Sequence, residues 1–196
     1  MLKDPTINPA TVAFDFDGVI ADTMTLFLEI ARSDYRVQGI DYDDITCYSL
    51  VDCIDIDPET VREISSRIVS GDYRYPLKIY AGAFEVLNRL AECRNPLLFV
   101  TARPDPGPLG DWVRENISLD SQQVEIVATG SFEEKATVLL EKNITHFVED
   151  RLETCFILQE DGITPVVFRQ PWNRQPHRFL EVGSWAELAR LIAFPE

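Results

Sequence analysis

Short apolar runs alternate along the chain with longer segments whose apolar residues recur at helical spacing. Five such runs, rich in β-branched and aromatic residues, span residues 11–16, 96–100, 124–128, 145–148 and 165–168. Runs of this length and composition predict strands, and their alternation with helices predicts a parallel sheet. The pattern therefore indicates an α/β fold.

Four helical segments alternate with these runs, at residues 83–93, 131–142, 151–161 and 184–192. Ser131 and Glu134 form a capping-box pattern at the start of the second segment, and Ser184 is a favourable N-cap for the last. Gly162 directly follows residues 151–161 and is a common C-terminal stop. These signals predict where the helices between the strands begin and end.

One interval breaks the alternation. After Asp17, about 60 residues pass without a convincing interior strand, which is far longer than an ordinary connection. Residues 22–32 and 58–70 in this interval have helical patterns. The interval also holds all six tyrosines, which are Tyr35, Tyr42, Tyr48, Tyr73, Tyr75 and Tyr80. We expect a core domain of residues 1–18 and 81–196, and a mostly helical module of residues 19–80, the helical insert.

Composition limits the classes of partner. With 196 residues and 45% hydrophobic content, the chain is long and apolar enough for one core with a smaller module. Its net charge of −15 argues against a nucleic acid polymer, although local cations or a metal would still allow a small anionic substrate.

No apolar run reaches the roughly 18 residues of a membrane span. The first ten residues lack the apolar core of a signal peptide, and the four cysteines show no zinc-type pairing. We therefore expect a cytoplasmic protein with reduced thiols and no membrane partner.

Two carboxylates follow the first apolar run. Asp15 and Asp17 are spaced i, i+2, which places their side chains on the same side of an extended chain, about 6.5–7 Å apart. Such a pair repels unless a cation or a shared proton lies between them, and the carboxyl end of a parallel strand is where ligands bind. The alternative is a strand that simply ends in an Asp-Gly turn, since Asp17 precedes Gly18.

The fourth apolar run also ends in acids, Glu149 and Asp150. Two strand ends rich in carboxylate predict a shared hard cation, and Mg²⁺ is the usual partner of oxygen ligands and substrate phosphate. The alternative is that Asp150 caps the helix that begins near Arg151.

Two further residues favour an anionic ligand at this edge. Thr101 ends the second run and offers a hydroxyl and nearby backbone N–H groups. Lys135 lies in the first turn of the helix predicted from Ser131, where a cation opposes the helix dipole at a cost of about 0.3–1 kcal/mol. Lys135 therefore points to an anion, or else it is a solvated side chain paired with an acid such as Glu141.

Four short motifs follow one another along the chain: "DFDGV" at 15–19, "VTAR" at 100–103, Lys135 and "VEDR" at 148–151. In this order they resemble the motifs of the haloacid dehalogenase superfamily of phosphatases. The resemblance implies a Rossmann-like three-layer α/β/α fold with a small helical cap inserted after the first strand. It also implies that Asp15 is the nucleophile that forms an aspartyl-phosphate, and that Asp17 is the general acid and base. Thr101, Ala102 and Lys135 would hold the phosphoryl oxygens.

The same resemblance implies a Mg²⁺ cofactor. Its ligands would be a side-chain oxygen of Asp15, the main-chain carbonyl of Asp17, and Asp150. Glu149 would lie behind these ligands and tune them. An acid at position 17 favours a phosphatase or a phosphomutase, because the dehalogenases of the superfamily lack it.

A narrower resemblance is to the 5′(3′)-deoxyribonucleotidase branch. It rests on the short helical cap, on "VEDR" and on "FRQPWNR" at 168–174, whereas Ala102-Arg103-Pro104 departs from the usual second motif of that branch. The substrate would be a small phosphomonoester, with a nucleotide as one candidate. The alternatives are a phosphomutase, and a protein of this fold that binds a ligand or partner with little turnover.

Three features of the sequence remain open. The tyrosines of the helical insert could stack on a nucleobase, but packing within the module is the expectation for most of them. Arg103 could contact substrate or pair with a surface acid. Trp172 lies in a proline-rich loop, where we expect it to anchor the loop over the sheet.

Overall fold

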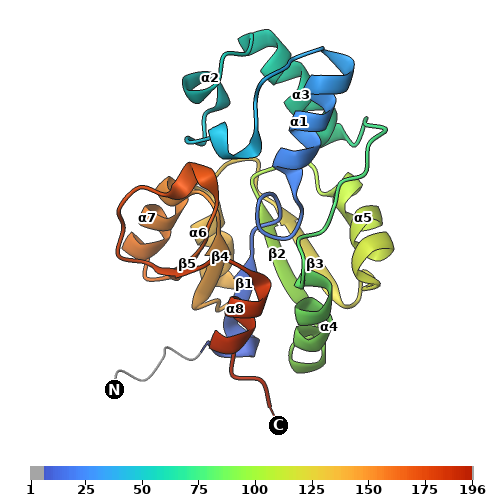
Figure 1. Ribbon diagram of the computed structural model, residues 1–196. Helices are drawn as coiled ribbons and strands as arrows, with labels where there is room; N and C mark the ends of the chain where they lie inside the picture. Colours follow the sequence, from blue (N-terminus) through green and yellow to red (C-terminus); the bar gives the residue numbers. More distant parts are fainter. Residues whose placement is uncertain (1–6, 196) are drawn as a thin grey trace.

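The computed structural model describes residues 7–195, and within them a six-stranded sheet runs in the order β3-β2-β1-β4-β5-β6 (Figure 1). Every neighbouring pair is parallel. The strands are β1 (Val12–Phe14), β2 (Leu97–Thr101), β3 (Val124–Ala128), β4 (His146–Glu149), β5 (Thr164–Phe168) and β6 (Leu180–Val182). The parallel sheet predicted from the apolar runs is confirmed.

The sequence does not reveal β6. This strand has three residues, lies at the edge of the sheet and pairs with β5 alone. Its central residue, Glu181, ion-pairs with Arg169 through an Oε1–Nε distance of 2.7 Å. A half-buried strand of three residues with a glutamate at its centre shows no apolar run that could predict it.

Helices cover both faces of the sheet. The helices α4 (Ala83–Cys93), α5 (Gly107–Ile117) and α8 (Trp185–Leu191) pack on one face, and α6 (Lys135–Glu141) and α7 (Leu152–Glu160) pack on the other. Val12 and Phe14 of β1 join the core of the first face, whereas Ala13 between them joins the second. This alternation gives the expected Rossmann-like three-layer α/β/α fold.

Two helices differ from the sequence prediction. Helix α6 begins at Lys135 and not at Ser131, because residues 131–134 form turns in which Ser131 Oγ accepts a 3.3 Å hydrogen bond from the Glu134 N–H. Helix α5 was not predicted, since Pro108 and Gly110 in its first turn are poor helix formers. Burial of its apolar side against the sheet overrides that local preference.

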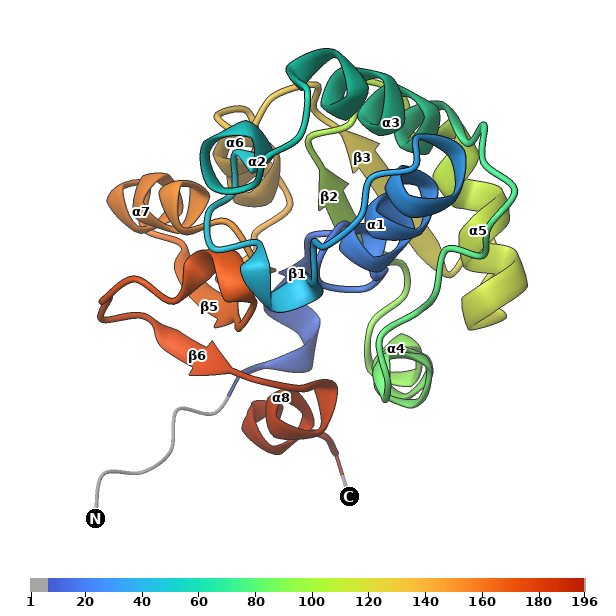
Figure 2. The same ribbon diagram turned by 45° about the horizontal axis from the view of Figure 1, so that its top comes forward.

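The helical insert contains α1 (Thr23–Asp34), a 3₁₀ turn η2 (Tyr42–Asp44), α2 (Leu50–Cys53) and α3 (Pro58–Ser70). Helices α1 and α3 pack on each other. The group stands beyond the carboxyl ends of the strands and comes forward over β1 and β2 when the molecule is turned (Figures 1 and 2). The division of the chain at residues 18 and 81 stays a prediction.

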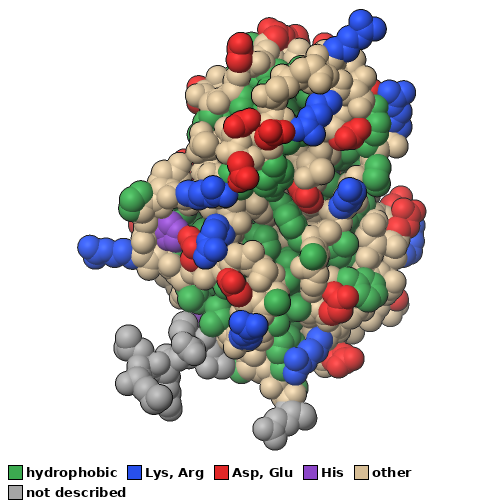
Figure 3. Space-filling view, viewed as in Figure 1, with side chains coloured by type: hydrophobic (Ala, Val, Ile, Leu, Met, Phe, Trp, Pro, Cys, Tyr) green, Lys and Arg blue, Asp and Glu red, His purple; other side chains and the backbone are tan. Residues whose placement is uncertain are grey.

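Charged side chains are mixed over the surface that Figure 3 shows. Lys and Arg side chains lie singly among Asp and Glu side chains on this face, with green apolar atoms between them. In the part of the chain that the structure describes, no helix combines the length and apolar character needed to cross a bilayer.

Candidate active site

The carboxyl ends of β2, β1 and β4 meet at one point of the sheet edge. Asp15 directly follows β1, and its N–H donates a 2.9 Å hydrogen bond to the carbonyl of Val148 in β4. Glu149 ends β4 and Thr101 ends β2. The strand order β2-β1-β4 therefore brings together acids that lie more than a hundred residues apart in the sequence.

Three carboxylates are buried side by side. Oxygen atoms of Asp15, Glu149 and Asp150 lie within 4.8 Å of one another, and each residue is no more than 5% exposed. Burial and repulsion from Glu149 raise the pKa of both Asp15 and Asp150 well above the ordinary value. Oδ1 of Asp150 is buried and has no hydrogen-bond partner among residues 7–195. An unpartnered oxygen in a set of hard oxygen donors fits a divalent cation such as Mg²⁺ or Ca²⁺.

Lys135 neutralises part of this charge. It is the first residue of α6 and is fully buried, with Nζ 3.0 Å from Asp15 Oδ1 and 2.8 Å from Glu149 Oε2. Burial lowers the pKa of Lys135, but the two carboxylates outweigh burial and raise that pKa above its usual value. The alternative of a solvated lysine paired with Glu141 is wrong.

Glu149 is already paired with Lys135 and hydrogen-bonded to backbone N–H groups. Its Oε1 accepts hydrogen bonds of 3.1 Å from the N–H groups of Asp150 and Arg151. Burial raises the pKa of Glu149, but the charge of Lys135 outweighs burial and the pKa lies below its usual value. Asp15 and Asp150 are therefore the carboxylates best placed to hold a cation, with Glu149 behind them.

The side chain of Asp17 lies outside this cluster. Its carboxylate accepts hydrogen bonds from Arg103 Nε (2.8 Å), from Arg103 Nη2 (2.7 Å) and from Thr23 Oγ1 (2.5 Å). Burial raises the pKa of Asp17, but Arg103 outweighs burial and the pKa lies below its usual value. The side chain of Asp17 is thus paired with Arg103 and takes no part in the carboxylate cluster, whereas a metal contact through the Asp17 main-chain carbonyl stays a prediction.

Of the three residues expected to hold phosphate, Thr101 and Ala102 line a hollow at this edge of the sheet, whereas Lys135 lies behind Asp15 and is not among the lining residues. Thr101 and Ala102 border a cavity of about 380 Å³ between the sheet edge and the helical insert, together with Asp15, Asp17 and Asp150. Thr101 Oγ1 also accepts a 3.2 Å hydrogen bond from the N–H of Arg103, which fixes the loop after β2.

The helical insert supplies the other wall of the cavity, which is mostly apolar. Its aliphatic and aromatic side chains there are Met24, Phe27, Leu50, Val61, Ile68 and Val69. Tyr48 also lines the cavity and meets Phe132 edge to face at 5.7 Å between ring centroids. The Arg151 guanidinium lies 4.1 Å from the centre of the Phe132 ring and 5.1 Å from that of Tyr48. This stack joins the insert to the loops of the core at the mouth of the cavity.

Trp172 contacts the predicted metal ligand directly. Its Nε1–H donates a 3.0 Å hydrogen bond to Asp150 Oδ2, and Asn173 Nδ2 donates a 2.7 Å hydrogen bond to the Asp150 carbonyl. The side chain of Trp172 is 4% exposed, as expected of a loop anchor, but the sequence did not reveal its partner. The signal available was the position of "QPWN" directly after β5, next to the strand end that carries Asp150.

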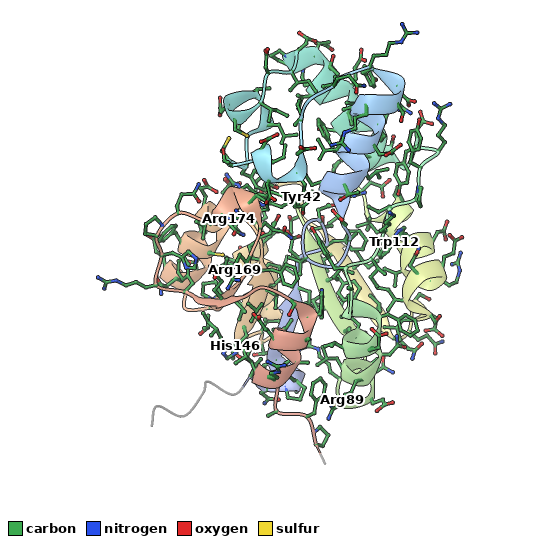
Figure 4. The ribbon with its side chains drawn as sticks, in the orientation of Figure 1. Tyr42, Arg89, Trp112, His146, Arg169 and Arg174 are labelled. Carbon is green, nitrogen blue, oxygen red and sulfur yellow. The ribbon has the colours of Figure 1, made fainter. Side chains whose placement is uncertain are left out.

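The loop after β5 that carries Trp172 also holds the helical insert against the core. Gln170 Nε2 donates to the Gly18 carbonyl (2.7 Å) and to Tyr80 Oη (2.9 Å), and Gln170 Oε1 accepts from Tyr42 Oη (2.9 Å). Figure 4 shows Tyr42 at this junction, close to the loop that carries Arg174. Tyr42 and Tyr80 thus act in packing the two parts together, as expected for most of the tyrosines.

Both the backbone conformation at position 18 and the closeness of Asp150 require a glycine there, so we predict that Gly18→Ala destabilises the protein. Its φ is +75°, and a Cβ atom there would lie 2.1 Å from Asp150 Oδ2. Left-handed backbone costs a non-glycine residue about 1–2 kcal/mol, and the overlap with Asp150 adds to that cost. Thermal unfolding followed by circular dichroism measures the loss as a fall in Tm.

The matched control for this prediction is Gly162→Ala. Gly162 has a φ of +85° and no atom within 4 Å of a built Cβ, so it reports the backbone cost alone. A fall in Tm no larger for Gly18→Ala than for Gly162→Ala would contradict the proposed close approach to Asp150.

Several solved structures share this fold. A haloacid dehalogenase-like family hydrolase from Streptococcus pneumoniae matches with 15% identity and a TM-score of 0.60, over 93% of this chain and 98% of its own. A hydrolase of the same superfamily from Deinococcus radiodurans, with bound phosphate and sodium, matches with 18% identity and a TM-score of 0.59, over 97% and 99%. The protein CbbY from Rhodobacter sphaeroides, in complex with phosphate, matches with 16% identity and a TM-score of 0.58, over 90% and 95%. At these identities the likeness shows the fold alone.

The sequence itself gives a family. No curated protein matches it significantly. The model of the family described as "5′ nucleotidase, deoxy (Pyrimidine), cytosolic type C protein" matches residues 8–194, which is nearly the whole chain. The chain therefore belongs to this nucleotidase family, and its resemblance to haloacid dehalogenase phosphatases of the nucleotidase branch is confirmed.

Proposed function

We propose that this protein is a Mg²⁺-dependent phosphatase that hydrolyses the 5′-phosphate of a pyrimidine deoxyribonucleotide. The observation that carries the proposal is the buried cluster of Asp15, Glu149 and Asp150, which Lys135 neutralises only in part, on the wall of a cavity of about 380 Å³. A cavity of this size suits a small ligand. Excess negative charge at its base suits a ligand that arrives with a cation.

Asp15 and Asp150 would hold the cation, together with the main-chain carbonyl of Asp17. When bound, Mg²⁺ would draw the phosphate into this negative site and balance the charge of its oxygens. The orphaned Oδ1 of Asp150 supports this assignment. Glu149 would keep Lys135 in place and act on the cation only from behind Asp15 and Asp150.

Asp15 is the proposed nucleophile. Its Oδ1 accepts hydrogen bonds from the Phe16 N–H (2.8 Å) and lies 3.0 Å from Lys135 Nζ, so the carboxylate is held at the cavity wall. Attack of a carboxylate oxygen on phosphorus forms an aspartyl-phosphate and breaks the bond to the leaving oxygen. Thr101, the backbone of Ala102 and Lys135 would hold the phosphoryl oxygens during the displacement.

Asp17 is the proposed proton carrier. It would take up a proton when the negatively charged phosphate binds beside it, give that proton to the leaving oxygen in the first step, and take one from the attacking water in the second, which releases phosphate and restores Asp15. Its side chain is 30% exposed and lines the cavity, so it can meet the leaving group and the water.

The helical insert would act as a cap over the bound substrate, with the core comprising residues 1–18 and 81–196. The apolar wall that it contributes suits a planar base and a sugar with few hydroxyl groups, and the description of the matched family names such a substrate. Tyr48 and Phe132 offer aromatic faces at the cavity mouth. A phosphomutase or a protein that only binds a ligand remains an outcome of the test below.

We predict that Asp15→Asn lowers kcat for thymidine 5′-monophosphate by roughly 10³-fold or more, because an amide cannot replace the attacking carboxylate. Phosphate release is measured with Mg²⁺ and with EDTA, and EDTA should abolish turnover by the parent protein. Asp161→Asn, at an exposed position after α7, is the control and should keep full activity.

Equal activity of Asp15→Asn and parent would sink the nucleophile assignment. A parent protein that releases no phosphate from any member of a panel of nucleotides and sugar phosphates would instead indicate a binding protein. Phosphate moved between two positions of a sugar, without release, would indicate a mutase.

Trp172→Phe keeps the ring but removes the hydrogen bond to Asp150 Oδ2. We predict that it weakens Mg²⁺ binding about 10-fold, since groups that orient a ligand commonly contribute that much. Isothermal titration of the protein with Mg²⁺ gives the dissociation constant. Trp112→Phe is the control, because the indole of Trp112 donates to the Leu77 carbonyl (2.9 Å) away from the acids. Equal affinity of the two variants would show that Trp172 does not orient Asp150.

A further inference from the structure

Arg103 is a buried cation, and each of its three side-chain nitrogens donates one hydrogen bond within the protein. It is 5% exposed, and Nε and Nη2 form a fork on the two oxygens of Asp17. Its remaining nitrogen, Nη1, donates a 3.2 Å hydrogen bond to the carbonyl of Ile68. The side chain therefore joins Asp17 of the core to α3 of the helical insert.

The Ile68 carbonyl is a favourable partner for a cation. Ile68 lies in the last turn of α3, where the carbonyl groups form the negative end of the helix dipole. Thr23, the first residue of α1, donates to the same Asp17 carboxylate at 2.5 Å. Thr23 of the insert thus holds Asp17 directly, and α3 of the insert holds Asp17 through Arg103.

One of the two roles left open for Arg103 by the sequence does not match this geometry. A pair with a surface acid would leave the guanidinium exposed, but it is buried and lies 5.7 Å from the centre of the Phe16 ring. Arg103 borders the cavity, but the hydrogen bonds of its side chain hold Asp17 and the carbonyl of Ile68 in place. The backbone at Arg103 is also fixed, since its carbonyl accepts from the Gly130 N–H (3.1 Å).

We propose that Arg103 is a positioning residue that holds the Asp17 carboxylate in the orientation required for proton transfer while the helical insert is docked. The inference rests on the proposed function, in which Asp17 exchanges protons with the leaving group and water. A planar fork fixes both the position and the plane of a carboxylate, which a lysine or a single hydrogen bond does not.

Leaving-group dependence tests this role. The parent protein, Arg103→Met, Asp17→Asn and the double variant are assayed with thymidine 5′-monophosphate, whose sugar oxygen needs a proton, and with p-nitrophenyl phosphate, whose leaving group needs little help. We expect Arg103→Met to lower kcat for the nucleotide roughly 10- to 100-fold with little change in KM, and to affect the aryl ester much less. The double variant should be no slower than Asp17→Asn, because Arg103 acts through Asp17.

Arg103→Lys provides a second variant if Arg103→Met does not fold. It keeps the charge but not the fork, and should show a smaller loss with the same dependence on the leaving group. Arg114→Met, at an exposed position of α5, is the control and should keep the parent rates with both substrates. Hydrogen exchange should be faster in α3 of the Arg103 variants than in the parent, and unchanged in α7.

Three results would overturn the inference. Equal losses of kcat/KM with both esters would show a general structural role, and additive losses in the double variant would show that Arg103 acts independently of Asp17. Unchanged exchange in α3 would show that Arg103 does not link Asp17 to the insert. A parent protein inactive on both esters would overturn the proposed function together with this inference, whereas an active parent with full activity in Arg103→Met would overturn the inference alone.

Discussion

Lys135 Nζ lies 3.0 Å from Asp15 and 2.8 Å from Glu149, inside the protein and with no exposed surface. One ammonium group in this position faces three buried carboxylates, because Asp150 lies beside the other two. Buried charge of one sign is costly unless it is paired, so the arrangement favours a second cation. The proposed chemistry follows from this imbalance: the acids would attract a metal ion, and the bound metal would in turn make a negative site attractive to phosphate.

The fold creates that imbalance through the order of its strands. Asp15 follows the central strand β1, and Asp150 follows its neighbour β4, so the acids meet without any long side chain having to reach across. The loop after β5 then fixes Asp150 from the other side through Trp172 and Asn173. Gly18 leaves room for this approach, since any side chain there would overlap with Asp150. Rigid strand ends and short loops thus set the positions of the acids before a ligand binds.

The sequence predicts those parts of the molecule that local patterns encode. Short apolar runs predict five of the six strands, and helical spacing predicts the limits of α3 and α4 as observed. The three-residue strand β6 and the proline-containing helix α5 escape prediction because tertiary packing, rather than local preference, forms them. The partners of Arg103 and Trp172 could not be predicted either. Each depends on a residue from another strand end, Asp17 or Asp150. The place of "QPWN" after β5 brings Trp172 near Asp150, but a single sequence does not specify the hydrogen bond that either side chain forms.

The contacts between insert and core connect packing with chemistry. Gln170 ties the Gly18 carbonyl to Tyr42 and Tyr80, while Arg103 ties Asp17 to α3. Both links end at Asp17 and Gly18, in the segment that follows β1. A shift of the helical insert would therefore displace this segment through two separate contacts. In the proposed mechanism, the Asp17 carboxylate would then reach its working orientation when the helical insert is in place above it. Because the same contacts that close the cavity also orient Asp17, exclusion of water and readiness for proton transfer would be reached together.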